Sequence, residues 1–165
     1  MTKRQIWLLA PALLCAACAT TGRMTPASGD AQAQMAAVVA QKVEQGALKM
    51  RFTMVQPRRF PPKMLDYGYM VELRNDSIFS YLPFYGRAYR ADFSQKSPLD
   101  FASRIREKQT DKGKRGSLVL LVKARAGSVD DYVYRFNIYE NGRVYLDVVG
   151  TNREQISFTG ELADE

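Results

Sequence analysis

The chain has 165 residues and a formal net charge of +7, and it contains no histidine. Hydrophobic residues make up 46% and charged residues 25%, an ordinary globular balance that excludes disorder over the whole length. The length suits one domain with a hydrophobic core, and the basic residues are scattered among acidic ones, so we expect no nucleic-acid partner.

The first residues have the layout of a secretory signal peptide. A basic start is followed by an apolar run, residues 6–14, that is too short to span a bilayer. Residues 14–18, L-C-A-A-C, resemble the bacterial lipobox, which implies cleavage before Cys18 and acylation of its sulfur. Cys15 would leave with the leader, so the folded domain would hold no thiol. An ordinary cleaved leader and an uncleaved anchor are the alternatives.

We predict three segments: a lipoprotein signal peptide at residues 1–17, a lipidated tether at residues 18–30 and a single β-rich domain at residues 31–163. The tether is rich in Thr, Ser, Gly, Pro and Ala and has no apolar period. The domain is predicted to begin with a helix at residues 31–46, capped by Asp30 and ended by Gly46. Four apolar side chains on one helical face are expected to pack on the domain: Met35, Val38, Val39 and Val43.

After the helix the apolar residues recur at every second position, which is typical of β-strands. The pairs Asn75-Asp76 and Asn141-Gly142 predict tight hairpin turns. Alternation in the first strand places Met54 inward, and the apolar run 118–122 predicts a strand buried on both faces. Strands are predicted at residues 48–56, 69–74, 77–82, 99–110, 117–125, 131–140, 143–150 and 155–162.

Short connections between these strands favour an antiparallel meander. The predicted fold class is therefore mainly β, with about seven to eight strands forming a small barrel or a strongly curved sheet and one helix at the N-terminus. A flat sheet with the helix across one face is the second arrangement. No βαβ alternation is present in the sequence, which argues against a parallel α/β fold.

Residues 80–89, S-Y-L-P-F-Y-G-R-A-Y, contain four aromatic rings and predict a corner in the chain. Pro83 cannot donate to a strand ladder, and Gly86 allows a backbone turn that other residues avoid. Tyr rings and Arg guanidinium groups suit sugars, peptides or acidic groups, because they combine flat apolar faces with hydrogen-bond donors. The candidate binding residues are Tyr81, Tyr85, Arg87, Tyr89 and Arg90, with Asn152, Arg153 and Gln155 as partners across the sheet.

A structural interpretation of the same residues competes with the binding one. It assigns Tyr81, Phe84 and Tyr89 to the corner of the core, where large rings are most often found. Gly86 would then make the bend, and Arg87 would pair with a carboxylate or with backbone carbonyls near Asn152. The two interpretations predict different exposure for the rings.

The motif YLPFYGRAY at residues 81–89, P-L-D-F at residues 98–101 and NREQISFTG at residues 152–160 together resemble a Bacteroidetes family called domain of unknown function 4251. The similarity spans residues 44–163. Phe84-Tyr85 swaps the usual order of the two rings, and residues 151–155 depart conservatively from the family pattern. The family has no established activity, so the resemblance implies no catalytic residue; its members usually follow a lipoprotein leader.

The residues after Cys18 lack an acidic run. In some lipoproteins of the Bacteroidetes, an acidic run at this position directs the protein to the cell surface. We therefore expect a cell-envelope lipoprotein on the periplasmic side of the outer membrane. Its partners would be the membrane, through acylated Cys18, and an envelope protein or glycan.

The absence of histidine removes Ser-His and Cys-His nucleophiles and the common zinc sites. No phosphate-binding or dinucleotide-binding glycine motif is present, and neither a metal nor a cofactor is predicted. We therefore expect no enzymatic activity. One alternative is a carrier of a small apolar ligand, lined by Tyr132, Tyr134 and Phe136; another is a carboxylate-based glycan hydrolase using residues among Asp66, Asp92, Asp100 and Glu154.

Overall fold

The computed structural model describes residues 28–66, 68–89, 96–114, 117–127 and 130–163. The signal peptide, Cys18 and most of the expected tether lie outside these residues, as do Arg90 and Asp92. One helix and nine strands are described: α1 (Ser28–Gln45), β1 (Leu48–Pro57), β2 (Lys63–Met64), β3 (Met70–Arg74), β4 (Ser77–Tyr81), β5 (Asp100–Lys112), β6 (Leu118–Ala126), β7 (Asp130–Ile138), β8 (Arg143–Gly150) and β9 (Arg153–Leu162).

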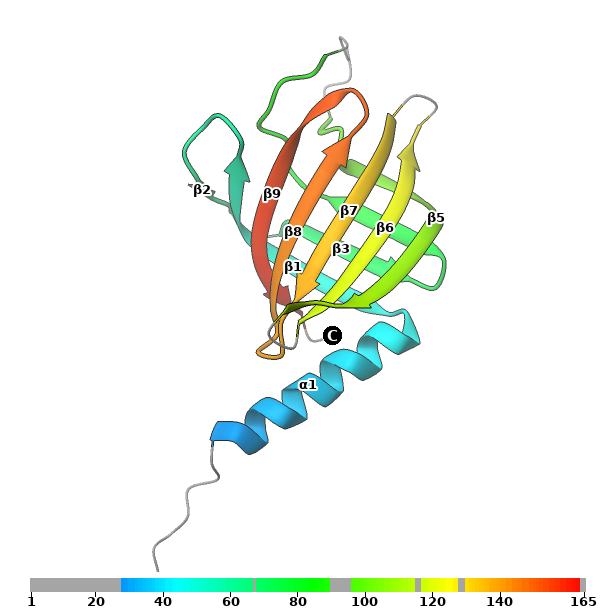
Figure 1. Ribbon diagram of the computed structural model, residues 1–165. Coiled ribbons are helices and arrows are strands. Elements are labelled where there is room, and N and C mark those ends of the chain that lie inside the picture. Colours follow the sequence, from blue (N-terminus) through cyan, green and yellow to red (C-terminus); the bar gives the residue numbers. More distant parts are fainter. Residues whose placement is uncertain (1–27, 67, 90–95, 115–116, 128–129, 164–165) are drawn as a thin grey trace, which may run out of the picture.

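The strands form one antiparallel sheet in the order β2-β1-β3-β4-β5-β6-β7-β8-β9, and an additional β1–β9 pairing closes it. The closed part is a barrel of eight strands, and the short β2 pairs with the C-terminal half of β1 (Figure 1). The predicted barrel is confirmed, and the flat-sheet alternative is wrong. Sequence analysis missed β2, whose two residues are too few to show a period.

The interior is filled by side chains that alternate along the strands. Tyr132, Tyr134 and Phe136 point inward as predicted and are at most 1% exposed. Their rings pack in series, with centroids 6.4 Å apart for the first pair and 6.1 Å apart for the second. Because these side chains are almost without accessible surface, no water-sized space borders them.

The hydroxyl of Tyr134 is satisfied inside the barrel. It donates to Ser80 Oγ over 3.1 Å, and Ser80 Oγ donates to the Leu99 carbonyl over 2.7 Å. Burial raises the pKa of Tyr134 far above its ordinary value, since the phenolate would lie in an apolar interior. The chain of hydrogen bonds ties β7 to β4 and to the segment before β5.

A bulge in β1 changes which residues face inward. Phe52 pairs with Gly160 of β9 and Met54 pairs with Thr159, so Thr53 is the additional residue. Val55 is therefore fully buried, whereas Met54 is half-exposed. The inward position predicted for Met54 is wrong, because the regular alternation stops at the bulge.

Strand β6 also differs from its prediction. Leu120 and Val122 are fully buried, but Leu121 between them is only half-buried. The outer face of β6 has no second layer of structure over it in the described part of the chain, so its apolar residues are partly exposed. The prediction of a strand buried on both faces is wrong.

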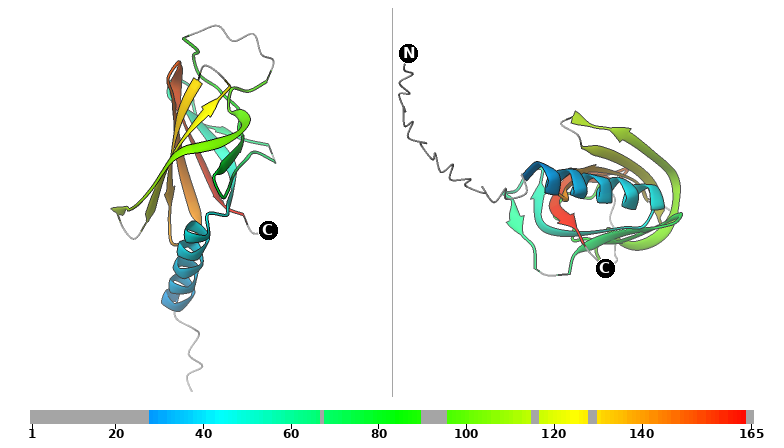
Figure 2. Two further views of the ribbon diagram at one scale, coloured as in Figure 1. Left: turned by 90° about the vertical axis from the view of Figure 1, so that its right-hand side faces the viewer. Right: turned by 90° about the horizontal axis from the view of Figure 1, so that it is seen from below.

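Helix α1 runs across one end of the barrel (Figure 2). Val39 and Val43 are buried against the core, whereas Val38 is 45% exposed and does not join them. The helix begins at Ser28 and includes Asp30, so the predicted cap at Asp30 is wrong. Gly46 ends it as predicted, with a φ of 69° and its N–H bonded to the Val43 carbonyl.

Candidate functional site: the corner end of the barrel

The barrel end opposite α1 is called the corner end, and residues 82–89 that follow β4 are called the corner segment. Backbone hydrogen bonds join this segment to the start of β9. The Tyr89 N–H donates to the Asn152 carbonyl over 2.9 Å, and the Glu154 N–H donates to the Arg87 carbonyl over 3.1 Å. Ala88 and Arg153 form an antiparallel bridge between them. Two of the three segments that carry the family resemblance, residues 81–89 and 152–160, are thus adjacent in space.

A buried ion pair lies beneath this junction. Arg153 Nε is 3.3 Å from Asp130 Oδ2, and their side chains are 7% and 17% exposed. Asn152 Nδ2 donates to Asp130 Oδ1 over 2.9 Å, and the Arg153 guanidinium lies 5.6 Å from the centre of the Phe84 ring. Burial raises the pKa of the neighbouring Tyr132 to about 12. Arg153 and Asn152 therefore act as structural links between β7, β9 and the corner segment.

Glu154 is a buried carboxylate with two partners. Arg59 Nε donates to its Oε1 over 2.7 Å, and the Arg87 N–H donates to its Oε2 over 3.4 Å. The hydrogen bond from Arg59 lowers the pKa of Glu154 below its ordinary value. A glycosidase acid needs a raised pKa, so Glu154 has the opposite electrostatic setting.

An aromatic hollow with a volume of about 370 Å³ opens between the loop that follows β1 and the corner segment. Lys63 Nζ lies 5.1 Å from the centre of the Tyr85 ring, and Phe60 is 58% exposed. Among the described residues, these line the hollow: Pro57, Phe60, Pro61, Lys63, Phe84, Tyr85 and Gly86.

Gly86 lines this hollow, and its lack of a side chain matters for the packing there. It is not among the described glycines with positive φ, so the predicted special turn is wrong. A Cβ at this position would lie 2.7 Å from the Phe84 ring. Glycine therefore lets the backbone pass close over that ring.

The exposure of Tyr81 and Tyr89 tests the structural interpretation, which places both rings in the core. Tyr81 is 51% exposed and stacks on Tyr69 with centroids 5.4 Å apart, and Tyr89 is 69% exposed. Assigning these two rings to the core was wrong; Leu82, which is 1% exposed, fills that place. The side chain of Arg87 is exposed, while its backbone N–H and carbonyl both bond to Glu154.

The structure brings five of the eight candidate residues to this junction: Tyr85, Arg87, Tyr89, Asn152 and Arg153. Gln155 lies instead on the outer face of the barrel, where its Nε2 donates to Asp147. Sequence reasoning missed Phe60 and Lys63. The segment P-R-R-F-P-P-K, residues 57–63, carried the signal, because it places a ring among prolines and basic residues.

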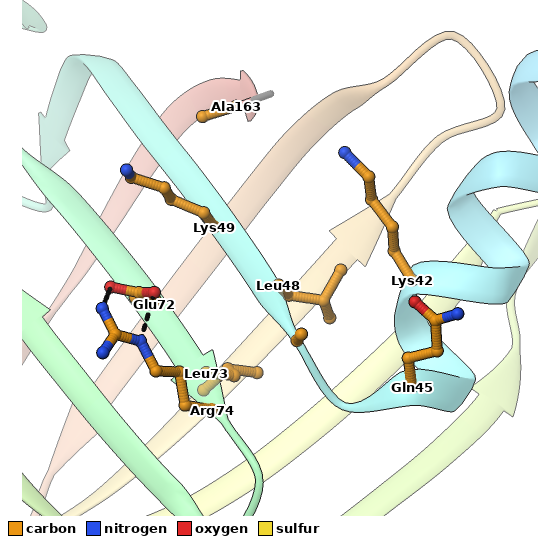
Figure 3. A pocket seen from close by; sticks show the side chains of 9 residues that line it. Lys42, Gln45, Leu48, Lys49, Glu72, Leu73, Arg74 and Ala163 are labelled. Carbon is orange, nitrogen blue, oxygen red and sulfur yellow. Dashed lines mark hydrogen bonds and ion pairs between the residues drawn. The ribbon is translucent and has the colours of Figure 1, made fainter. Parts of the chain in front are cut away.

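A second hollow, of about 620 Å³, lies beside the end of α1 (Figure 3). Figure 3 shows Lys42 extending from α1 and Lys49 from β1, while Glu72 and Arg74 form a double hydrogen bond on β3. The leucines at its base are at most 1% exposed. Four charged side chains, Lys42, Lys49, Glu72 and Arg74, line it, in contrast to the aromatic hollow.

The part of the chain that the structure describes contains no group of three or more metal-ligating side chains. Within the same residues, no helix has the length and apolar character needed to cross a membrane.

The family model described as a domain of unknown function (DUF4251) matches residues 30–162, which include α1 from Asp30 onward and all nine described strands. The chain belongs to the DUF4251 family. A solved relative is the crystal structure of a DUF4251 family protein from Bacteroides eggerthii, with a TM-score of 0.59 and 10% sequence identity over 81% of this chain and 89% of that chain. At this identity the likeness supports the fold alone. The search of curated proteins found no match.

Proposed function

We propose that this DUF4251 protein is a non-catalytic lipoprotein, anchored through Cys18 on the periplasmic side of the outer membrane, that binds an envelope component through the corner end. The leader layout and L-C-A-A-C at residues 14–18 support the anchor. Each acyl methylene buried in a membrane contributes about 0.8 kcal/mol, so acyl chains on Cys18 would hold the domain without a membrane-binding protein surface.

The aromatic hollow is the observation that carries the binding role. Phe60 is 58% exposed at the hollow, and Tyr89 at the end of the adjoining corner segment is 69% exposed. Exposed aromatic groups beside a concave surface are typical of recognition sites rather than of solvated surface. The neighbouring Arg87 adds an exposed guanidinium, and its backbone is held by hydrogen bonds to Glu154 of β9.

Two observations favour binding over the alternatives. The low pKa of Glu154 and its bond to Arg59 are unsuited to a general acid. The rings proposed to line an apolar carrier pack against one another and are at most 1% exposed. We therefore propose neither a glycan hydrolase nor an interior carrier.

Labelling with a palmitate analogue tests the anchor. We expect the wild-type chain, expressed in its host, to incorporate the label and to sediment with outer membranes. The Cys18→Ser variant should be unlabelled and remain soluble or carry an uncleaved leader, whereas Cys15→Ser should be labelled normally. Equal signal from wild type and Cys18→Ser would contradict the anchor.

Replacement of Arg87 by alanine tests the binding role. Because the side chain is exposed and the backbone makes the structural contacts, the free energy of unfolding should change by no more than about 0.5 kcal/mol. Capture of the envelope partner by the full-length protein should fall at least about tenfold. A large drop in the thermal midpoint would instead assign Arg87 to stability, and unchanged capture would remove it from the binding surface.

A further inference from the structure

We propose that the aromatic hollow binds an extended peptide segment in which an apolar ring or proline lies between acidic residues, and that this segment pairs with the free edge of β2. The proposal rests on the binding function above and specifies its ligand. It uses three features of the corner end: the lining of the hollow, the edge of β2 and the local excess of positive charge.

The lining favours a peptide over a sugar. Pro57, Pro61, Phe60 and Phe84 give the hollow apolar walls, and none of its described lining residues has a carboxylate or amide side chain. Sugar sites need such groups to bond several hydroxyls, whereas proline and aromatic side chains of a peptide dock on aromatic and proline surfaces. The volume of about 370 Å³ suits one or two such side chains.

The edge of β2 offers backbone bonds to an extended chain. In the described part of the chain, β2 pairs only with β1, in the register Met54 opposite Met64 and Val55 opposite Lys63. The Leu65 N–H donates to the Thr53 carbonyl, so Met64 occupies the non-hydrogen-bonded position of the antiparallel ladder.

The N–H and C=O of Met64 consequently point away from β1, and this residue is 69% exposed. Figure 1 shows β2 at the periphery of the barrel, where a strand can approach its outer side. An incoming segment can therefore form a pair of backbone hydrogen bonds with Met64 while an adjacent side chain enters the hollow beside Lys63.

The charges around the hollow favour an acidic ligand. Two acids of low exposure lie at this end, and each has a guanidinium partner: Arg59 donates to Glu154, and Arg153 pairs with Asp130. The positive charge of Arg58 also lowers the pKa of Glu154. Lys63 at the hollow and the exposed Arg87 add further positive charge, which would attract carboxylates that flank an apolar side chain.

Fluorescence anisotropy with synthetic peptides tests this proposal. The probe is a short labelled peptide with a Phe-Pro pair between Asp and Glu residues, titrated with the full-length protein purified in detergent. We expect saturable binding that weakens with added salt. A peptide with Lys in place of the acids, and one with Ser-Ser in place of Phe-Pro, should each bind at least about tenfold more weakly.

Matched variants locate the site. Phe60→Ala and Lys63→Glu should each weaken binding of the acidic peptide by about tenfold or more. The controls Tyr139→Ala and Lys112→Glu remove an exposed ring and an exposed charge from the described residues away from the hollow, and they should bind like wild type. Circular dichroism should show the same fold for all four.

The proposal would be overturned if the acidic peptide showed no saturable binding, if the Lys peptide bound equally well, or if the control variants lost as much binding as the site variants. It would also be overturned if an anionic polysaccharide displaced the peptide and its own binding required Phe60. The peptide-binding experiment and the labelling of Cys18 test different parts of the chain, so failure of one does not imply failure of the other. If Arg87→Ala abolishes capture of the envelope partner while the acidic peptide does not bind, the binding function stands and only the ligand class is wrong.

Discussion

Replacement of Gly160 by alanine is expected to lower the free energy of unfolding by about 3 kcal/mol, because it forces apart the two strands that close the barrel. Gly160 of β9 lies opposite Phe52 at the bulge of β1. An added Cβ would lie 2.8 Å from both the Phe52 Cα and the Arg51 carbonyl carbon. Both are backbone atoms, so no side-chain rotation relieves the contact. Urea unfolding followed by circular dichroism measures the loss.

The neighbouring variant Glu161→Ala is the matched control. Glu161 is exposed on the same strand, and alanine there adds no atom near β1, so the unfolding midpoint should stay close to that of wild type. A Gly160→Ala protein as stable as this control would show that the two strands are less closely apposed than described.

Removal of the Asp130 carboxylate, in Asp130→Ala, is expected to cost about 3 kcal/mol. It removes the carboxylate that pairs with the buried Arg153 guanidinium and that accepts a hydrogen bond from the Asn152 amide. Desolvated charges that lose a counterion are costly, because water cannot replace the partner. Equilibrium urea unfolding at neutral pH gives the difference from wild type.

Asp131 provides the comparison one residue away. Its carboxylate pairs with Arg125 over 2.7 Å, but both side chains are well exposed, so Asp131→Ala should cost far less than Asp130→Ala. The double variant Asp130→Ala/Arg153→Met should recover part of the loss, since it also removes the buried guanidinium that paired with Asp130. If both single aspartate variants unfold alike, the Arg153–Asp130 pair does not contribute as a buried pair.

Local patterns in the sequence predicted most of the barrel. The alternation of Tyr132, Tyr134 and Phe136 fixed the inward face of β7, and the Asn141-Gly142 turn joined β7 to β8 as expected. These features depend on a few adjacent residues, so a single sequence contains the information. The resemblance to the family was found from the same kind of evidence, three short contiguous motifs, and the family model confirmed the family.

What local patterns could not predict depends on contacts between distant segments. The bulge that turns Val55 inward is set by how β9 passes β1, and those strands are far apart in sequence. The aromatic hollow likewise forms between the loop after β1 and the corner segment, which are separate in the sequence. The sequence alone therefore gave no sign that Phe60 lines the same hollow as Phe84 and Tyr85. Tyr81 and Tyr89 were misplaced because large rings usually fill cores, whereas here Leu82 takes the interior position.

The seam between β1 and β9 has a consequence for how the molecule can be made. β1 and β9 are neighbours, so a growing polypeptide cannot complete its hydrogen-bonded ring until β9 has emerged. Contacts between such distant segments slow folding, because a long loop must be closed before they stabilise anything. Until then β1 and β8 would each present an unsatisfied edge, the kind of surface that recruits other chains. During synthesis the unfinished barrel can therefore pair with other chains until the ten residues of β9 dock against β1 and β8.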